Sequence, residues 1–311
     1  MAENTVKKIA TRESYGNSLK ELAEEFPNLV VLDADLAAAT KTGIFRKAYP
    51  DRHIDCGIAE ENMMGVAAGL SLVGKIPFVS SFAMFAAGRA YDQIRNSVAY
   101  PKLNVKICGT HAGVTVGEDG ATHQMLEDLS LMRSIPNMTV LCPSDDTQTK
   151  WAIKEMAKFD GPVYIRLARV ATPIIYDENQ KFEIGKMVQI GDGPDATIFA
   201  TGVEVAETLK AKEELEKENI NIRVVDVHTI KPIDREMIVK CAKETKKIIT
   251  IEDHSIIGGL GTAICEVLSE EYPTKVYRMG IKDEFGKSGK AEQLLKYFKL
   301  DSQAIIEKVK E

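Results

Sequence analysis

The stretch GIAEENMMGVAAGLSLVGKIPFVSSF, residues 57–82, decides the fold class of the chain. Residues 60–73 have the length and composition of a buried helix, and the apolar run 77–82 that follows has those of a buried strand. The same alternation continues on both sides of this stretch. Further strands are predicted at 28–35, 104–111, 139–143 and 162–167, and further helices at 84–99 and 145–159. Strands that are apolar on both faces and separated by helices are typical of a parallel sheet covered on both sides.

The segment 171–195 interrupts this pattern because it is rich in Pro, Gly and charged residues. A second α/β series follows it. Its strands are predicted at 196–202, 221–230, 246–253 and 275–281, and its helices end at Glu218 or span 234–245 and 260–271. A length of 311 residues also suggests two domains. We therefore predict an α/β fold with two open, parallel-type domains, residues 1–170 and 196–311, joined by a connection at 171–195.

The composition argues against several classes of protein. The net charge of −6 and the pI near 5.6 argue against a nucleic-acid-binding surface, which needs clustered Lys and Arg. No run of about 18 apolar residues is present, so we expect no membrane span. Residues 1–16 lack the apolar core of a signal peptide, and the five cysteines are scattered singly. These features predict a protein of the reducing cytoplasm that binds neither nucleic acid nor membrane.

The densest polar cluster, THAGVTVGEDGATHQMLED, occupies residues 110–128, at the end of the predicted strand 104–111. In open α/β sheets, ligands bind at the carboxyl ends of the strands, and the glycines of this loop allow close approach of a ligand. His111 and His123 lie here together with Asp119. A solvated acidic loop is the simpler interpretation, but two histidines at a strand end favour a functional site. A zinc site made by these three residues is an open alternative, although their spacing is not that of a zinc motif.

Two further pairs of residues have both a structural and a chemical interpretation. Glu60 and Glu61 stand at the predicted start of helix 60–73, where acidic side chains stabilise the partial positive charge of the helix terminus. Either both serve the helix start or one of them has a chemical role. Phe82 and Phe85 lie three residues apart at a strand-to-helix junction. They either pack in the core or form a platform for a flat heterocycle.

Two glycine-containing segments imitate cofactor motifs without the required context. GDG at 191–193, followed by Asn219 and Asn221, imitates a diphosphate and magnesium motif, but it precedes the predicted strand 196–202 instead of following a strand. We interpret it as a turn. GGLG at 258–261 lacks the GxGxxG spacing and is interpreted as the entry to a helix. We therefore assign no metal ligand to this chain.

Four motifs together resemble the C-terminal half of transketolase, over nearly the whole length of the chain. The most specific is GEDGATHQ (117–124), which is similar to the family's GEDGPTHQ. GIAEENM (57–63) resembles the segment with the glutamate that activates thiamine diphosphate, and SSFAMF (80–85) resembles the pyrimidine-stacking segment. PNMTVLCPSD (136–145) stands in the expected place. The resemblance implies a pyrimidine-binding domain followed by the C-terminal domain of the family.

The resemblance also implies an activity and a role for each matching residue. The activity is the transfer of a two-carbon glycolaldehyde unit from a ketose phosphate to an aldose phosphate. Glu60 is implied to be the catalytic glutamate, which bonds to N1′ of the cofactor's aminopyrimidine, and His123 is implied to assist. The remaining implied contacts are Asp35, Leu36, Phe82 and Phe85 with the cofactor, and Arg12, His111, Asp119, His123 and Arg169 with the sugar phosphates.

The diphosphate-binding domain of the family, with its own GDG motif, has no counterpart in this sequence. The resemblance therefore implies that thiamine diphosphate is shared with a separate N-terminal subunit of roughly 300 residues, which binds Mg²⁺ or Ca²⁺. Paired active sites suggest a two-plus-two heterotetramer. Two positions depart from the family pattern. Gly88 replaces the third stacking aromatic, and Ala39 replaces a serine that helps to hold phosphate.

Three alternatives remain open at this point. Deoxyxylulose-5-phosphate synthase shares the segment RAYDQ (89–93), and the beta subunit of a 2-oxoacid dehydrogenase shares the architecture. The synthase is ordinarily a single long chain, and EDGATHQ followed by Glu127 and Asp128 fits transketolase better. The beta subunit is not expected to carry GEDGATHQ with both histidines. The third alternative is a catalytically silent scaffold subunit. A scaffold would have no use for Glu60, Asp119 and His123, so we favour the enzyme.

Overall fold

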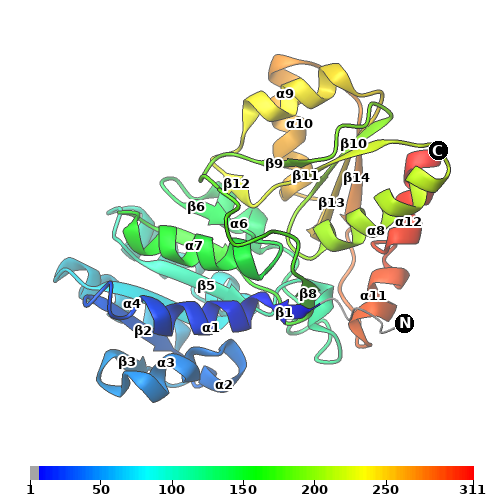
Figure 1. The fold of residues 1–311 in the computed structure, drawn as a ribbon. Helices are drawn as coiled ribbons and strands as arrows, with labels where there is room; N and C mark the ends of the chain where they lie inside the picture. The colour runs from blue at the N-terminus through cyan, green and yellow to red at the C-terminus, as the bar shows by residue number, and fades with distance from the viewer. Residues whose placement is uncertain (1–6) are drawn as a thin grey trace.

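The computed structural model describes residues 7–311, which form two α/β parts built on separate sheets (Figure 1). The first sheet has seven strands in the order β12-β6-β7-β5-β4-β2-β3. The strands are β2 Leu29–Asp33, β3 His53–Asp55, β4 Ile76–Phe82, β5 Lys106–Thr110, β6 Thr139–Leu141, β7 Val163–Arg166 and β12 Thr229–Lys231. Every neighbouring pair is parallel except β12 with β6. The expectation of an open, mainly parallel sheet is therefore confirmed here.

The helices of the first part bury both faces of its sheet. They are α1 Thr11–Leu22, α2 Ala37–Thr40, α3 Thr42–Ala48, α4 Glu60–Leu72, α5 Tyr91–Gln93, α6 Asp128–Ser134 and α7 Asp146–Lys158. Phe78 and Val79 are neighbours on β4, yet they belong to different hydrophobic clusters, because successive side chains of a strand point to opposite faces. Phe78 packs with residues of α1 and α7, and Val79 packs with residues of α4. The strands are therefore apolar on both faces because helices pack against each face of the sheet.

Local chemistry sets several helix boundaries, and one predicted helix is irregular. Asp145 caps α7 by accepting a hydrogen bond from the N–H of Gln148 at 2.8 Å. The stretch 84–99, predicted as one α-helix, instead has π-helical turns at Met84–Arg89 and Ile94–Ala99 around the short α5. A π-turn holds an extra residue and rotates the side chains that follow it. The α-helical period therefore does not give the direction of those side chains.

The second part has a five-stranded sheet in the order β14-β13-β10-β11-β9. Its strands are β9 Val188–Ile190, β10 Ala196–Ala200, β11 Ile222–Asp226, β13 Ile248–Ser255 and β14 Val276–Ile281. All pairs are parallel except β9 with β11. Its helices are α8 Glu204–Lys217, α9 Arg235–Glu244, α10 Leu260–Glu271, α11 Ala291–Tyr297 and α12 Ser302–Lys310. In Figure 1, α9 and α10 lie together on one side of this sheet, and α8 and α12 lie together on the other.

Two expectations about the second series need correction. The predicted strand 221–230 breaks after Asp226, and the residues Thr229–Lys231 form β12, which pairs with β6 of the first sheet. The connection 171–195 is not free of strands. Its first residues, Ala171–Pro173, form β8 and pair with β1 (Lys8–Ala10), and its later residues form β9. Strands this short carry too few alternating positions to be visible as a pattern.

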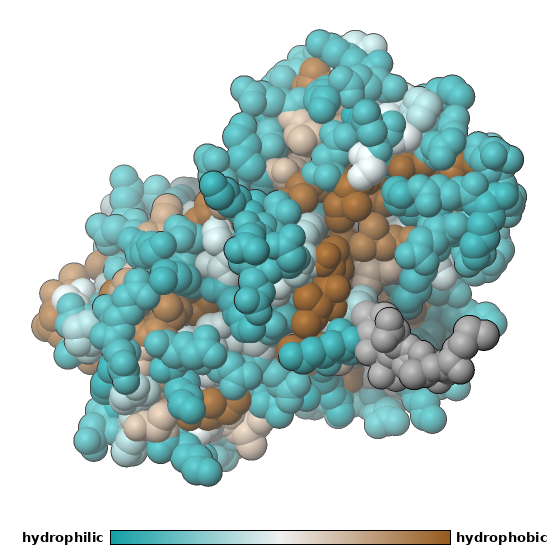
Figure 2. Space-filling model, in the orientation of Figure 1, coloured by the Kyte–Doolittle hydropathy of each residue, from teal (hydrophilic) through white to brown (hydrophobic). Residues whose placement is uncertain are grey.

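The two parts share one hydrophobic core. A single cluster of buried residues contains Tyr164 and Val140 from the first sheet and Phe199 and Val225 from the second. Figure 2 shows apolar side chains gathered in the furrow between the two parts on one face of the molecule. Burial of this kind opposes separation of the parts. In residues 7–311, none of the helices has the length and apolarity needed to cross a membrane.

Candidate active site

The carboxyl ends of β2, β4 and β5 meet at one edge of the first sheet. The chain leaves β2 for β3 on one side and then forms β4 on the other side, so a topological switch point lies between β2 and β4. Ligands bind at such points in open α/β sheets. The segments that follow these three strands begin at Ala34, Ala83 and His111. They carry most of the residues that the sequence analysis singled out.

Burial separates the two adjacent glutamates. Glu60 is the first residue of α4 and only 1% exposed, whereas Glu61 is exposed. The Nη1 group of Arg89 donates a hydrogen bond to Oε2 of Glu60 at 2.7 Å. The same guanidinium lies over the ring of Phe85, 4.6 Å from its centroid. A helix start does not need a buried carboxylate, so the structure favours a chemical role for Glu60.

Four rings pack against one another at the ends of β4 and β5 and in the loop that follows β5. Phe82 and Phe85 stack with their centroids 5.9 Å apart and their planes 12° apart. Phe82 also stacks on His111 with a centroid distance of 3.8 Å and is only 8% exposed. His123 packs edge-on against both phenylalanines. Its ring centroid lies 6.2 Å from that of Phe82 and 5.5 Å from that of Phe85. Of the four rings, Phe85 and His123 are half-buried, whereas Phe82 and His111 are buried.

His111 is held as a neutral, directed imidazole. Its backbone is in the left-handed region with a φ of +57°, a conformation that non-glycine residues adopt chiefly where the surroundings enforce it. Arg12 donates from Nη1 to its Nε2 at 2.9 Å, so this nitrogen accepts and the proton is on Nδ1, which lies 2.8 Å from Oγ1 of Thr110. Burial, with the nearby Arg12 and Arg169, lowers the pKa of His111 to about 3.

Two guanidinium groups, those of Arg12 and Arg169, line a hollow. Arg169 donates from Nη1 to the carbonyl oxygen of Val116 at 2.8 Å and to Oδ2 of Asp119 at 3.0 Å. Arg12 donates to the carbonyl oxygen of Ala39 at 3.0 Å. Both arginines line a hollow of about 400 Å³. Burial lowers the pKa of Arg12, and the neighbouring Arg169 lowers it further because the two cations repel each other. An anion bound in the hollow would relieve this repulsion.

Asp35 and Leu36 lie at the same edge, between β2 and α2. Asp35 has a left-handed backbone with a φ of +60°, and its N–H donates to Oδ1 of Asp55 at 3.1 Å. The same oxygen accepts from the N–H of Gly57 at 2.9 Å. The segment that leads to Glu60 is therefore tied to Asp35. All ten residues singled out as site residues thus lie at this edge or in the loop beside it, and their individual roles remain predictions.

The alternatives to this site are resolved as follows. The zinc set is not assembled, because Arg12 occupies Nε2 of His111 and Arg169 pairs with Asp119. Among residues 7–311, no group of three or more His, Cys, Asp or Glu could hold a metal ion. GDG at 191–193 lies in the connection between β9 and β10, directly after β9, and Asp192 accepts a hydrogen bond from Nη2 of Arg223 at 2.7 Å. α10 begins at Leu260 within GGLG.

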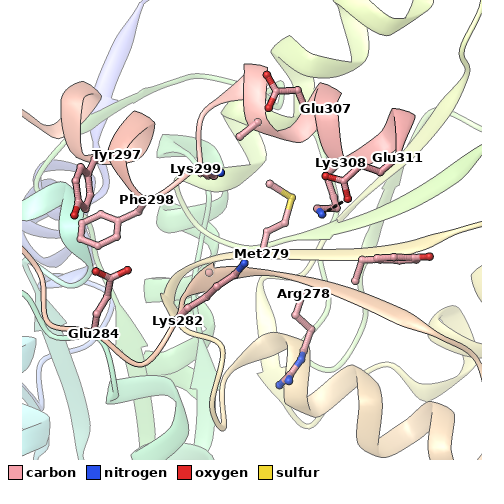
Figure 3. Close-up of a pocket in the computed structure, with 13 residues that line it drawn as sticks. Arg278, Met279, Lys282, Glu284, Tyr297, Phe298, Lys299, Glu307, Lys308 and Glu311 are labelled. Atoms are coloured by element: carbon pink, nitrogen blue, oxygen red, sulfur yellow. Dashed lines mark hydrogen bonds and ion pairs between the residues drawn. The ribbon is translucent and has the colours of Figure 1, made fainter.

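A second hollow, of about 500 Å³, lies on the outer side of the second part, between β14, α11 and α12 (Figure 3). Figure 3 shows side chains of both charges around it, among them Lys282, Glu284, Lys308 and Glu311. None of the residues predicted for the site lies there. Mixed charges without a convergent set of groups do not define a chemistry, so we place the site at the first sheet.

Two residues that contact the site or its loop were missed or interpreted differently from the sequence. No role was predicted for Arg89 from the sequence, yet it pairs with Glu60, which is 29 residues away. Arg89 ends the π-helical turn Met84–Arg89, so the α-helical period could not show where its side chain lies. Asp253 was taken only as the end of a strand. It contacts the loop 110–128 from the second part, and no local pattern indicates this contact.

Two family models match the chain. The model described as "Transketolase, pyrimidine binding domain" matches residues 7–174, and the one described as "Transketolase, C-terminal domain" matches residues 185–305. Together they cover both α/β parts.

Curated relatives are similar over almost the full length of the chain. A protein of Methanocaldococcus jannaschii, provisionally named transketolase C-terminal section, is 54% identical over 96% of this chain and 95% of its own length. A 6-deoxy-6-sulfo-D-fructose transketolase subunit of Clostridium sp. (strain MSTE9) is 45% identical over 95% of this chain and 92% of its own length. Human transketolase is 41% identical over 97% of this chain but only 49% of its own length. This chain thus corresponds to about half of the human enzyme.

A solved structure is also similar throughout. It is a split gene transketolase in the form of an inactive β4 tetramer, with a TM-score of 0.91 and 52% sequence identity. The match covers 97% of each chain.

Proposed function

The chain belongs to the transketolase family, and from this premise we propose that it is the C-terminal subunit of a split transketolase. In this proposal it transfers a two-carbon glycolaldehyde unit from a ketose phosphate to an aldose phosphate, together with a separate N-terminal subunit. The observation that carries the proposal is Glu60, a carboxylate that is buried at a helix start and linked through Arg89 to the ring of Phe85. Membership of the family implies the use of thiamine diphosphate.

The residues present fit the pyrimidine end of that cofactor. When bound, thiamine diphosphate supplies the nucleophilic carbon and the electron sink that cleavage of a carbon–carbon bond needs. In the proposal, Glu60 holds a proton at N1′ of the aminopyrimidine, and Phe85, backed by Phe82, stacks on the ring. Arg89 contacts both Glu60 and Phe85, so in the proposal it holds the carboxylate in place relative to the stacking ring. Asp35 and Leu36 border the same space.

The sugar substrates are assigned to the polar side of the site. We assign Asp119 and His123 to the hydroxyl groups of the donor. Arg12 and Arg169 face the hollow of about 400 Å³, where their combined charge suits a phosphate group. His111 is neutral and its Nε2 accepts from Arg12, so it orients the guanidinium instead of adding charge. Ala39 offers its carbonyl oxygen to Arg12 in place of a serine hydroxyl, which leaves the arginines as the main phosphate contacts.

The proposed partner supplies what this chain does not. Human transketolase is about twice as long as the region that this chain matches, and the split relative is inactive as a β4 tetramer. The partner would bind the diphosphate with Mg²⁺ or Ca²⁺. The surface around Glu60 fits such a partner, because Ile58 is 76% exposed and Glu61 and Asn62 are exposed as well. A two-plus-two heterotetramer, in which each site lies between unlike subunits, is the simplest assembly.

The test is glycolaldehyde transfer from xylulose 5-phosphate to ribose 5-phosphate, with thiamine diphosphate and magnesium present. The chain is assayed alone and together with the candidate N-terminal subunit. We expect activity only in the mixture. No activity in a mixture that has been shown to assemble would contradict the proposal. The assay would then be repeated with 6-deoxy-6-sulfofructose as donor, because the Clostridium relative is named for that sugar and the two arginines would accept a sulfonate.

A further inference from the structure

The loop that carries Asp119 and His123 is held by the second part of the molecule. We call residues 113–126 the substrate loop. In the second sheet, the chain passes from β10 to β11 on one side and later forms β13 on the other side, so its own switch point lies between β10 and β13. A ligand would be expected at the carboxyl ends of these strands. The substrate loop fills this position instead, against Asp253 near the end of β13.

Asp253 accepts three hydrogen bonds from two consecutive residues of the loop. Its Oδ1 accepts from the N–H of Val114 at 2.7 Å, and its Oδ2 accepts from the N–H and from Oγ1 of Thr115, at 3.2 Å and 2.7 Å. The Asp253 side chain is buried, so these charge-assisted bonds are not weakened by water. Gly113 has a φ of +81°, and a Cβ atom there would lie 2.1 Å from Oδ2 of Asp253. Only glycine allows this approach.

The rest of the loop is fixed by matching contacts. The side-chain amide of Gln124 donates to the carbonyl oxygens of Val114, Gly117 and Lys287, at 3.2, 3.1 and 2.8 Å. The N–H of Ser255, at the end of β13, donates to the carbonyl oxygen of Leu126 at 2.9 Å. The loop is therefore attached at its start, within its turn and at its end. Each of these attachments reaches a residue of the second part.

These contacts continue to the residues assigned to the substrate. Arg169 donates both to the carbonyl oxygen of Val116 and to the carboxylate of Asp119. The position of Val116 follows directly from that of Thr115, which Asp253 holds. A shift of the loop backbone would therefore move Asp119 and Arg169 together. His123 would move as well, because Gln124 fixes the residue next to it.

We propose that Asp253 is a positioning residue for donor binding, through which the second part sets the geometry of the substrate loop. This inference rests on the proposed function, since it assigns the donor to Asp119 and His123. Asp253 touches neither cofactor nor substrate in this account. The second part thus contributes to catalysis by holding a loop of the first part through residues near the end of β13.

The experiment compares Asp253→Asn with the matched control Glu252→Gln in the complex with the N-terminal subunit. Glu252 is the neighbouring buried carboxylate on β13, but it accepts from the N–H groups of Leu260 and Gly261 in α10, away from the loop. Two milder variants of the loop are included in case Asp253→Asn does not fold. Thr115→Val removes the hydrogen bond that the Thr115 hydroxyl donates to Asp253. Thr115→Ser keeps a hydroxyl that can donate it.

Two readouts are measured: the KM and kcat for the ketose donor, and amide hydrogen exchange of the substrate loop. For Asp253→Asn we expect the donor KM to rise roughly tenfold, with a smaller fall in kcat and faster exchange at Val114 and Thr115. Thr115→Val should show a smaller effect of the same kind, roughly threefold. Thr115→Ser and Glu252→Gln should keep the KM and the loop exchange of the unaltered complex.

Three results would overturn the inference. The first is a donor KM and a loop exchange in Asp253→Asn and Thr115→Val that equal those of Glu252→Gln. The second is faster loop exchange with an unchanged KM, which would make Asp253 a purely structural residue. The third is an assembled, unaltered complex without transfer activity. That result would contradict the proposed function and with it the role in donor binding, while the exchange readout would still decide whether Asp253 holds the loop.

Discussion

The carboxyl ends of the two sheets have similar architecture and opposite surroundings. At the first sheet, the residues beyond the strands include the exposed Asp119 and the half-buried His123, Phe85 and Arg169. At the second sheet, the corresponding residues Glu252, Asp253 and His254 are almost completely buried. One edge presents polar groups to a hollow, and the other is closed by a loop of the first part. The same position in the fold thus serves binding in one sheet and support in the other.

This difference predicts two kinds of mutational effect. Polar groups that face a hollow can still bond to a ligand, whereas the buried carboxylates Glu252 and Asp253 already accept hydrogen bonds from backbone N–H groups. Substitutions at the first edge should therefore reduce activity at nearly constant stability. Substitutions at the second edge should act on stability or, through the substrate loop, on donor binding. The following variants would break or sharpen the distinction.

The largest effect is expected for Glu60→Gln. This change keeps the shape of the side chain but removes the group that holds a proton, so kcat of the assembled complex should fall roughly 10³-fold. The matched control is Glu61→Gln, because Glu61 is adjacent and exposed. It should retain most of the activity. Glu60→Gln with more than about a tenth of the normal kcat would contradict a catalytic role for this residue.

His123→Ala should reduce kcat/KM for the ketose donor by roughly 10²-fold, because a hydrogen bond to a substrate hydroxyl is lost in a partly buried site. The affinity for thiamine diphosphate should change far less. Both quantities are measured on the same complex, by steady-state kinetics and by titration of the cofactor. Equal losses in donor use and in cofactor affinity would assign His123 to the cofactor and not to the donor.

Arg89→Met tests the ion pair with Glu60. Removal of the guanidinium leaves a carboxylate that is 1% exposed without its hydrogen-bond partner, so we expect kcat to fall roughly tenfold. Arg95→Met is a control from the same helical stretch, since Arg95 is exposed and its guanidinium donates to Oδ1 of Asn96, at 2.8 Å. Should both variants lose activity to the same extent, the pair with Glu60 would not be the cause.

The smallest effect is expected at the second edge, for His254→Gln. Burial lowers the pKa of His254 to about 4, while Asp128, Glu252 and Arg166 are the charged groups near it. An unfolded chain protonates this histidine near pH 6.5, so stability is complete above that pH and is lost as the pH falls toward 4. At pH 5.5 this protonation lowers the free energy of unfolding by about 1 kcal/mol, and His254→Gln should abolish that decrease.

The measurement is the free energy of unfolding from denaturant titrations at pH 7.5 and pH 5.5. A pH dependence that is the same with and without His254 would show that other groups cause the acid sensitivity. Activity at pH 7.5 should change little, because the polar partners of His254, namely Asp128, Glu252 and Ser255, lie outside the substrate loop. A large loss of activity at that pH would contradict the distinction between a binding edge at the first sheet and a supporting edge at the second.

Much of the fold follows from the sequence because its strands are apolar on both faces. The run 28–35 contains β2 and the run 77–82 lies within β4, so periodicity located these strands to within a few residues. β12 and β9 could not be found in this way. Each has three residues, and each pairs antiparallel at the edge of a sheet, through contacts that form only when distant segments pack.

The site divides in the same way. The site residues were predicted from motifs, and their position at the carboxyl ends of the strands predicted that they would lie close together. The pairings were not predictable, since Arg12 bonds to His111 across 99 residues and Thr115 bonds to Asp253 across 138. Such pairings depend on the packing of the two parts and on the π-helical turns that direct Arg89. The chemistry of the site is therefore visible in the sequence, and its support is visible only in three dimensions.

The central claim is that the edge of the first sheet forms one half of a thiamine diphosphate site. Calorimetric titration of thiamine diphosphate, with magnesium present, tests this claim most directly on three samples: this chain, the candidate N-terminal subunit, and their mixture. We expect the mixture to bind at least about tenfold more tightly than either chain alone. A mixture that binds no more tightly than the N-terminal subunit alone would contradict the claim.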